Sequence, residues 1–408
     1  MKPTLQTIKL CESEIRFEPL KKDTIIDKIY KCLKKISAGS FGTVYSGINL
    51  DTNEEVAIKI EKIEKEEMRS VFREVQFLKR LESVNGIPKL YWHGSEGRYD
   101  IMVLSLLGKD LSGYLRIYHK FSMKTVVFIA DQILTILEEV HNSGIVHRDL
   151  KPENIVVGRG ENSNQMFLID FGISKIYKDT YGRHIPYREK KSFIGTARYA
   201  SLAAHDGIEI SRKDDLESLG YVILYLLKGS LPWQNLNVNE KEKCKKVGEL
   251  KAALKPEELF KEFPEELVKY MNYVKGLDFK ENPDYNFMKG LFIKLAISKK
   301  YIIDNLFDWS VPPRKEKKSI NYKKEKEEII IKSFENLPNF DKTKNVKVSS
   351  LADFNKEEKK QQLLEVPSKI NFESSSRSRF NSILGSLAIN IDNTLNNIID
   401  EDLSSFIF

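Results

Sequence analysis

Residues 147–154 read HRDLKPEN, and residues 168–172 read LIDFG. The first stretch sets a carboxylate, a lysine and an amide at a spacing that predicts a catalytic loop. In such a loop Asp149 can accept a hydroxyl proton, Lys151 can face a transferred phosphoryl group and Asn154 can hold a metal ion. Asp170 in the second stretch adds a hard oxygen ligand of the kind that Mg²⁺ takes. Each residue alone could be a turn, cap or strand-end residue, but the two motifs together rarely arise by chance.

A glycine-containing turn lies upstream, where residues 36–44 read ISAGSFGTV between two predicted strands. Glycines in such a turn let backbone N–H groups approach a phosphate that a Cβ would hold away. Alone, the turn is more often a plain hairpin, and it matches neither the P-loop nor the dinucleotide fingerprint. Lys59 ends the next strand, and Glu74 lies on the helix that follows. A pair between them would hold the lysine on the phosphates of a nucleotide.

Hydrophobic periodicity predicts an α+β chain with two lobes. A period of two, broken by turn residues, predicts antiparallel strands over 31–36, 43–47, 55–60 and 100–107. A helical period predicts one helix, 66–81, among these strands. Beyond Gly108 the pattern is mainly helical, with predicted helices over 124–142, 216–228, 265–275 and 285–297.

The predicted boundaries are an N-terminal extension over 1–27, a catalytic domain over 28–310 and a tail over 311–408. Within the domain, a small β-rich lobe covers about 28–107 and a larger helical lobe about 108–310. The tail starts with a charged linker and continues rich in Asn, Ser, Lys and Glu, which predicts disorder. A docked helix over 383–399 is the alternative for its last part.

Composition limits the function classes. The 408 residues are 41% hydrophobic and 31% charged, which is enough apolar material for a folded core. The cysteines are too few and too scattered for a disulfide framework or a zinc site. No signal peptide or membrane-length apolar run is visible, and the net charge of +7 accompanies no nucleic-acid-binding motif. We expect a cytoplasmic protein without nucleic-acid or membrane partners; a nuclear import signal at 314–318 is the alternative to a solvated linker.

With these motifs the chain resembles the protein kinases over about residues 29–309. The resemblance implies a two-lobed fold with ATP in the cleft, protein substrates, and Mg²⁺ held by Asn154 and Asp170. It also implies a pair between Lys59 and Glu74. Lys151, two residues after Asp149, is similar to the serine/threonine kinases. The residues implied to contact ATP are Ile36, Ser37, Ala38, Gly39, Ser40, Phe41, Gly42, Val44, Ala57, Lys59, Leu104, Ser105, Leu106, Leu107 and Asn154.

A narrower resemblance, to the casein kinase 1 family, rests on several short stretches. The Ala-Pro-Glu motif of other kinases is missing, and residues 201–203 stand where that family also departs from it. Asp215 resembles the helix aspartate that braces the catalytic loop. Ser37 in place of the first loop glycine, and a catalytic loop closer to kinases generally, indicate a divergent member. The stretches are GIP at 86–88, HIPYREKK at 184–191, GTARYAS at 195–201, GIE at 207–209, GSLPWQ at 229–234, PDY at 283–285 and FDW at 307–309.

The casein kinase 1 resemblance also implies a basic pocket that binds a phosphorylated or acidic residue three positions before the target serine or threonine. Lys191, Arg198 and Lys243 fall on that pocket, and an arginine can hold a phosphate bidentately. Lys243 also belongs to a charged run, 241–246, that needs no function. In the tail, autophosphorylation with autoinhibition is the alternative to an inert segment, because three serines follow an acidic residue at the same spacing: Ser376, Ser404 and Ser405.

Two other classes remain as rivals. A pseudokinase scaffold would normally have lost the strand lysine, the catalytic aspartate or the metal aspartate, and the chain keeps all three. A small-molecule kinase of the same fold is disfavoured by the stretch from His184 to Ser201, which favours protein substrates. The family resemblance further implies a monomer.

Overall fold

The structure is a computed structural model that describes residues 23–39, 42–63, 69–302, 304 and 306–310. The described residues all belong to one compact unit. Ser40 and Phe41 of the predicted phosphate loop lie outside the described residues, as do residues 1–22 and the tail from 311. The predictions that concern the tail, including its three serines and its basic run, therefore stay predictions.

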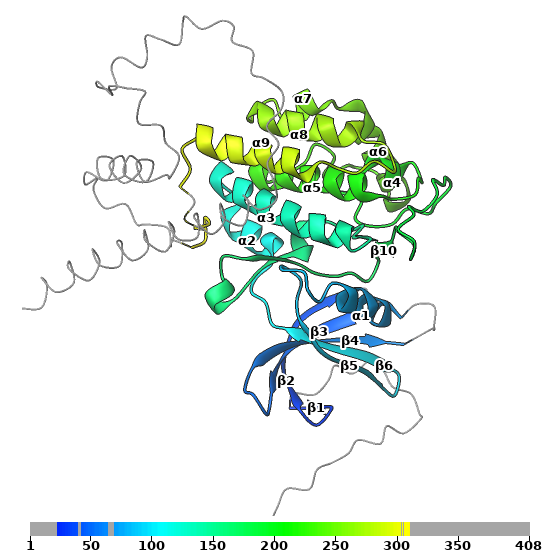
Figure 1. Cartoon of the computed structure of the whole chain (residues 1–408), viewed down its shortest axis with the longest axis vertical. Helices are drawn as coiled ribbons and strands as arrows, with labels where there is room; N and C mark the ends of the chain where they lie inside the picture. The colour runs from blue at the N-terminus through cyan, green and yellow to red at the C-terminus, as the bar shows by residue number, and fades with distance from the viewer. Residues whose placement is uncertain (1–22, 40–41, 64–68, 303, 305, 311–408) are drawn as a thin grey trace, which may run out of the picture. The chain divides into compact units, whose positions relative to one another are not determined.

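The smaller lobe is a six-stranded sheet, blue to cyan in Figure 1, with the order β1-β2-β3-β4-β6-β5 and antiparallel neighbours throughout. The alternation of apolar and polar residues in the sequence decides which face of the sheet is buried. Val56, Ile58 and Ile60 are buried in the lobe's core, whereas Ala57 and Lys59 between them stay partly exposed. The strands are β1 (Ile25–Ile26), β2 (Tyr30–Gly39), β3 (Gly42–Asn49), β4 (Glu55–Lys62), β5 (Leu90–Glu96) and β6 (Tyr99–Ser105).

One helix, α1 (Ser70–Arg80), packs against β4, β5 and β6. Its buried stripe consists of Val71, Val75 and Leu78, as the helical period requires. Glu74 lies on the same stripe and is only 2% exposed. The amphipathic helix therefore carries one carboxylate into the interior, where it needs a partner.

The larger lobe is built around two helices, α3 and α5, whose facing side chains form the main hydrophobic core. Short strand pairs, β7 with β10 and β8 with β9, hold the segments between them. The helices are α2 (Leu111–Tyr118), α3 (Met123–Asn142), α4 (Leu202–His205), α5 (Arg212–Lys228), α6 (Glu240–Ala253), α7 (Pro256–Leu259), α8 (Glu265–Gly276) and α9 (Tyr285–Ser298). The short elements are β7 (Ile145–Val146), η2 (Pro152–Asn154), β8 (Ile155–Val157), η3 (Gly160–Asn162), β9 (Met166–Leu168) and β10 (Lys175–Ile176).

The strands and helices predicted from periodicity are present, with ends displaced by a few residues. One difference concerns a predicted boundary. Ile25 and Ile26, placed by the prediction in the extension, form β1 on the sheet, and Ile26 is fully buried. The run 241–246 lies within helix α6. None of the helices that the structure describes is long and apolar enough to cross a membrane.

Candidate active site

The loop between β7 and β8 carries the first predicted motif, and one buried carboxylate holds its backbone. Asp215 in the first turn of α5 accepts hydrogen bonds from the backbone N–H groups of His147, at 2.7 Å, and Arg148, at 2.8 Å. Burial would raise the pKa of Asp215, but His141, His147 and the backbone N–H of Arg148 together outweigh burial, and the pKa is lowered. Arg148 has φ of 71°, a costly region for a residue with a side chain. Asp215 therefore fixes a strained turn.

Asp149 follows this turn and is surrounded by donors. Its Oδ2 accepts a hydrogen bond from Nζ of Lys151 at 2.5 Å, and its Oδ1 accepts one from the hydroxyl of Thr196 at 2.7 Å. The side-chain amide of Asn154 donates to the backbone carbonyl of Asp149 at 2.9 Å. The carboxylate is 6% exposed and held from both sides. This arrangement can orient it toward a hydroxyl group.

Lys59 joins the two lobes. Its Nζ lies 2.6 Å from Glu74 Oε2 and 3.2 Å from Asp170 Oδ1. Burial alone would lower the pKa of Lys59, but the two carboxylates raise it above its ordinary value. Asp170 shows the reverse: burial would raise its pKa, and Lys59 lowers it. Glu74 Oε1 also accepts a hydrogen bond from the backbone N–H of Phe171 at 3.3 Å. The pair implied by the sequence is thus present.

The predicted ATP-contacting residues of the sheet lie in register. Val44 pairs with Lys59, and Ala57 pairs with Leu104, which lies just before the end of β6. All are partly exposed on the face that Lys59 shares. Gly42 has φ of 110°, and a Cβ there would lie 2.3 Å from the carbonyl oxygen of Ile60. Only glycine fits that position. Residues 36–39 at the end of β2 are exposed, and residues 105–107 follow from β6 into the larger lobe.

Asn154 and Asp170, the predicted metal ligands, lie on the neighbouring ends of β8 and β9. The backbone N–H of Ile169 donates to the carbonyl of Asn154 at 3.0 Å, which ties the two segments together. Within the described ranges there is no cluster of three or more His, Cys, Asp or Glu side chains that could hold a metal ion. Mg²⁺ at nucleotide sites takes only one or two protein oxygens, because phosphates and water complete its octahedron. A carboxylate and an amide oxygen fit that requirement.

The family model described as protein kinase domain matches residues 30–291, more than half of the chain. The chain belongs to the protein kinase family. Its sheet and helices are the two lobes of the kinase fold, and the family supports phosphotransfer to protein substrates, with ATP as the phosphoryl donor. The match covers kinases as a whole, so the casein kinase 1 resemblance stays a prediction.

The three residues predicted to bind a substrate anion differ in their surroundings. The Arg198 guanidinium lies 5.8 Å and 5.7 Å from the ring centroids of Tyr199 and Tyr225, and it is exposed. Lys191 is 3.4 Å from Glu209, so an anion there would compete with a carboxylate. Lys243 is exposed on α6. Of Arg198 and Lys191, Arg198 is therefore the one whose charge is not already paired with a carboxylate among the described residues.

Two side chains that the sequence does not mark as functional, Thr196 and Lys251, contact the predicted catalytic aspartate and the segment around Arg198. Thr196 was part of a quoted motif, but nothing in the sequence showed that it would reach Asp149. Lys251 on α6 is fully buried and donates hydrogen bonds to the carbonyls of Ala197, at 2.8 Å, and Ala200, at 2.6 Å. Its Nζ also lies 4.6 Å from the ring centroid of Tyr221. A lysine in a polar helix gives no sequence signal of such burial.

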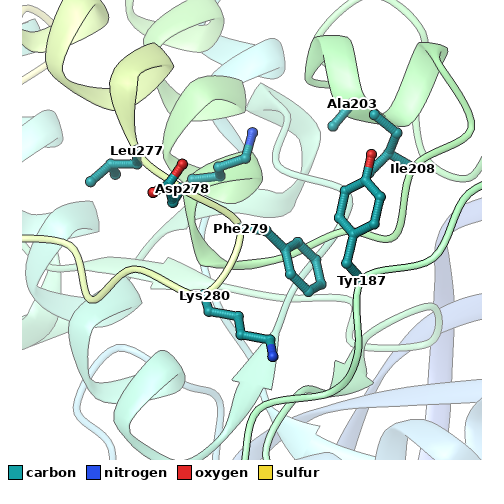
Figure 2. Close-up of a pocket in the computed structure, with 8 residues that line it drawn as sticks. Tyr187, Ala203, Ile208, Leu277, Asp278, Phe279 and Lys280 are labelled. Atoms are coloured by element: carbon teal, nitrogen blue, oxygen red, sulfur yellow. The ribbon is translucent and has the colours of Figure 1, made fainter.

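A separate hollow of about 550 Å³ borders the segment after β10 (Figure 2). The rings of Tyr187 and Phe279 meet edge to face, with centroids 5.5 Å apart. Lys280 and Lys213 stand at its rim. Its lining shares no residue with the catalytic cluster, so it adds nothing to the assignment of the nucleotide site.

Proposed function

We propose that this kinase is a serine/threonine protein kinase that transfers the γ-phosphoryl group of ATP with Mg²⁺ and prefers phosphorylated or acidic sites, as casein kinase 1 enzymes do. The observation that carries the proposal is the cluster around Asp149. One carboxylate there is oriented by Lys151 and Thr196, on a loop whose backbone Asp215 fixes. A hydroxyl of a substrate fits between such donors and the nucleotide side of the cleft.

Each side chain has a distinct role in the proposed reaction. Asp149 accepts the proton of the serine or threonine hydroxyl while that oxygen forms its bond to the γ-phosphorus. The bond from the γ-phosphorus to the bridging oxygen breaks, and ADP leaves with that electron pair. Lys151 offsets the charge that develops on the phosphoryl oxygens, and Lys59 holds the phosphates of ATP. When bound at Asn154 and Asp170, Mg²⁺ would supply further neutralisation of phosphate charge.

The serine/threonine preference rests on Lys151 and Thr196. The lysine two residues after the proposed catalytic aspartate is the sequence feature of that class, and its contact with Asp149 at 2.5 Å supports a role beside it. The casein kinase 1 preference rests on the quoted stretches and on the exposed guanidinium of Arg198. In place of the missing Ala-Pro-Glu motif, Ser201 caps α4 by accepting a hydrogen bond from the backbone N–H of Ala204 at 3.2 Å.

The full-length protein with labelled ATP and Mg²⁺ tests the proposal. Matched peptides would carry serine, threonine or tyrosine as the acceptor, each with and without a phosphoserine three residues before it. We expect label on serine and threonine only, and faster transfer to the phosphorylated peptides. Label on tyrosine at a similar rate would reject the class, and equal rates on both peptide sets would reject the substrate preference. No transfer to any peptide or to a protein mixture, with ATP bound, would favour a pseudokinase scaffold.

A further inference from the structure

A second hollow, of about 620 Å³, lies between the end of α2 and the end of α5. Its charged side chains are all basic, and no aspartate or glutamate contributes to its wall. The cations come from three places: the last turn of α2, the segment after it, and the last turn of α5. The lining residues are Ser112, Leu115, Arg116, Tyr118, His119, Lys120, Tyr225, Lys228, Gly229 and Ser230.

The frame of this basic pocket is rigid. The backbone N–H of Phe121 donates to the carbonyl of Leu226 at 2.8 Å, which joins the segment after α2 to α5. Gly229 caps α5 with φ of 77°, and a Cβ there would lie 2.6 Å from the carbonyl oxygen of His119. The two chain segments therefore touch backbone to backbone, and the basic side chains extend from a fixed base.

Within the described ranges, the cations of the pocket have no acidic partner. Arg116, Lys120 and Lys228 are exposed, and in the part of the chain that the structure describes none of them makes an ion pair. Nearby lysines do find partners: Lys124 lies 2.5 Å from Asp304. A concave wall with cations of one sign concentrates positive potential and attracts anions.

One residue that lines the pocket, Tyr225, also lies close to the segment that carries Arg198. Its ring centroid lies 5.7 Å from the guanidinium of Arg198 and 5.6 Å from the ring of Tyr199. Two residues before Arg198, Thr196 contacts Asp149. A peptide whose hydroxyl reaches Asp149 and whose chain passes Arg198 would therefore come close to the pocket.

We propose that this basic pocket binds a run of aspartate and glutamate residues in the protein substrate, at a distance from the phosphorylated hydroxyl. The inference rests on the proposed function and names a second contact for its substrates, separate from Lys191, Arg198 and Lys243. A volume within the range of about 300–1,000 Å³ that suits small ligands holds several side chains. Cations spread over three segments fit several carboxylates along a chain better than one phosphate, which needs donors that converge.

The test compares the full-length protein with a triple variant, Arg116→Gln/Lys120→Gln/Lys228→Gln. A matched control, Lys280→Gln/Lys294→Gln/Lys299→Gln, removes the same charge from other surfaces. Peptide substrates share one unphosphorylated serine core and carry a flank of four acidic or four neutral residues, placed at increasing distance on either side. A further peptide has two phosphoserines in that flank. The kcat and KM values are measured at low and high salt. Binding of the acidic peptide with alanine in place of serine is followed by fluorescence anisotropy.

We expect the acidic flank to lower KM for the wild type and the control, and the triple variant to lose about tenfold of that advantage with kcat unchanged, because exposed charge pairs each contribute modestly. The advantage should also shrink at high salt. The neutral-flank peptide should be phosphorylated equally by all three proteins. An acidic preference that survives in the triple variant, or a loss confined to the phosphoserine flank, would overturn the inference. Failure of the wild type on every peptide would instead count against the proposed function.

Discussion

The catalytic cleft and the basic pocket differ in whether their cations are paired with carboxylates. In the cleft the two lysines contact carboxylates: Lys59 contacts Glu74 and Asp170, and Lys151 contacts Asp149. At the pocket, Arg116, Lys120 and Lys228 are solvated and, among the described residues, unpaired. The cleft groups are mostly buried, with 12% of the Lys59 side chain and 3% of the Glu74 side chain exposed.

The difference follows from what each region must do. A group that acts on the phosphoryl group must be oriented before the substrate arrives, and burial with an internal partner provides this orientation. A group that selects a substrate must keep its charge available, since an internal carboxylate would compete with the ligand. On this view, changes in the cleft should lower turnover, and changes at the exposed cations should alter substrate choice.

The largest effect is expected for Asp149→Asn. The amide cannot accept the hydroxyl proton, so kcat should fall by about 10²–10⁴. Steady-state assays with a serine peptide would measure it. Thermal unfolding should show that the variant is folded, and Asp51→Asn, an exposed aspartate in the turn between β3 and β4, is the control. Unchanged turnover would show that Asp149 takes no part in the reaction, and would contradict the expectation that changes in the cleft lower turnover.

The next effect concerns the residue that positions Asp149. Thr196→Val removes the hydroxyl that donates to Oδ1 at 2.7 Å. A hydrogen bond to a charged group contributes about 1.5–3 kcal/mol, so kcat should fall by about 10- to 100-fold. Thr196→Ser keeps the hydroxyl and should retain most of the activity. If valine and serine at this position gave the same kcat, the contact would have no part in catalysis.

The contacts of the cleft were largely predictable, because they belong to short motifs. The pair between Lys59 and Glu74, implied by the family resemblance, is present in the structure. Ala57, also implied to contact ATP, is partly exposed on the same face of β4 as Lys59. Ser40 and Phe41 lie outside the described residues, so their part in the phosphate loop stays a prediction.

The substrate side was less predictable, because its contacts join segments that no local pattern links. Lys251 lies in a helix of polar residues, and its burial depends on how α6 packs against the segment around Arg198. The basic pocket needs the ends of α2 and α5 to meet, and α2 itself was not among the predicted helices. Lys191 showed a further limit, since its sequence position gave no sign of Glu209.

Lys251 is buried, and its Nζ is in hydrogen-bond contact with the carbonyls of Ala197 and Ala200 and with His205 Nε2. Burial lowers its pKa to about 7. The unfolded chain, with a lysine pKa of about 10.4, binds more protons above pH 7, so this group makes folding more favourable as pH rises. Relative to Lys251→Met, the wild type should gain up to about 1.4 kcal/mol per pH unit between pH 7 and 9.

Thermal or denaturant unfolding of both proteins at several pH values would measure this gain. Burial lowers the pKa of His205 to about 4, so His205 stays neutral in the folded protein in this window. Burial raises the thiol pKa of Cys244, which makes folding less favourable as pH rises through the ordinary thiol pKa of about 8.5, so Cys244 cannot account for a gain. Lys245→Met, on the exposed side of the same helix, is the control. A constant difference between wild type and Lys251→Met from pH 7 to 9 would show that the buried amine does not titrate there.

The smallest effect is expected at the exposed guanidinium. Arg198→Ala removes a cation that makes no ion pair within the described ranges, so KM for a peptide with phosphoserine at the third position before the acceptor should rise about five- to tenfold, with kcat unchanged. The unphosphorylated peptide should lose little. Lys191→Ala should change the same KM less, because Glu209 already neutralises that lysine at 3.4 Å. An equal rise in KM for the two variants would show that pairing with Glu209 does not weaken the part of Lys191 in substrate binding. An equal rise on both peptides would show that Arg198 does not select the phosphorylated one.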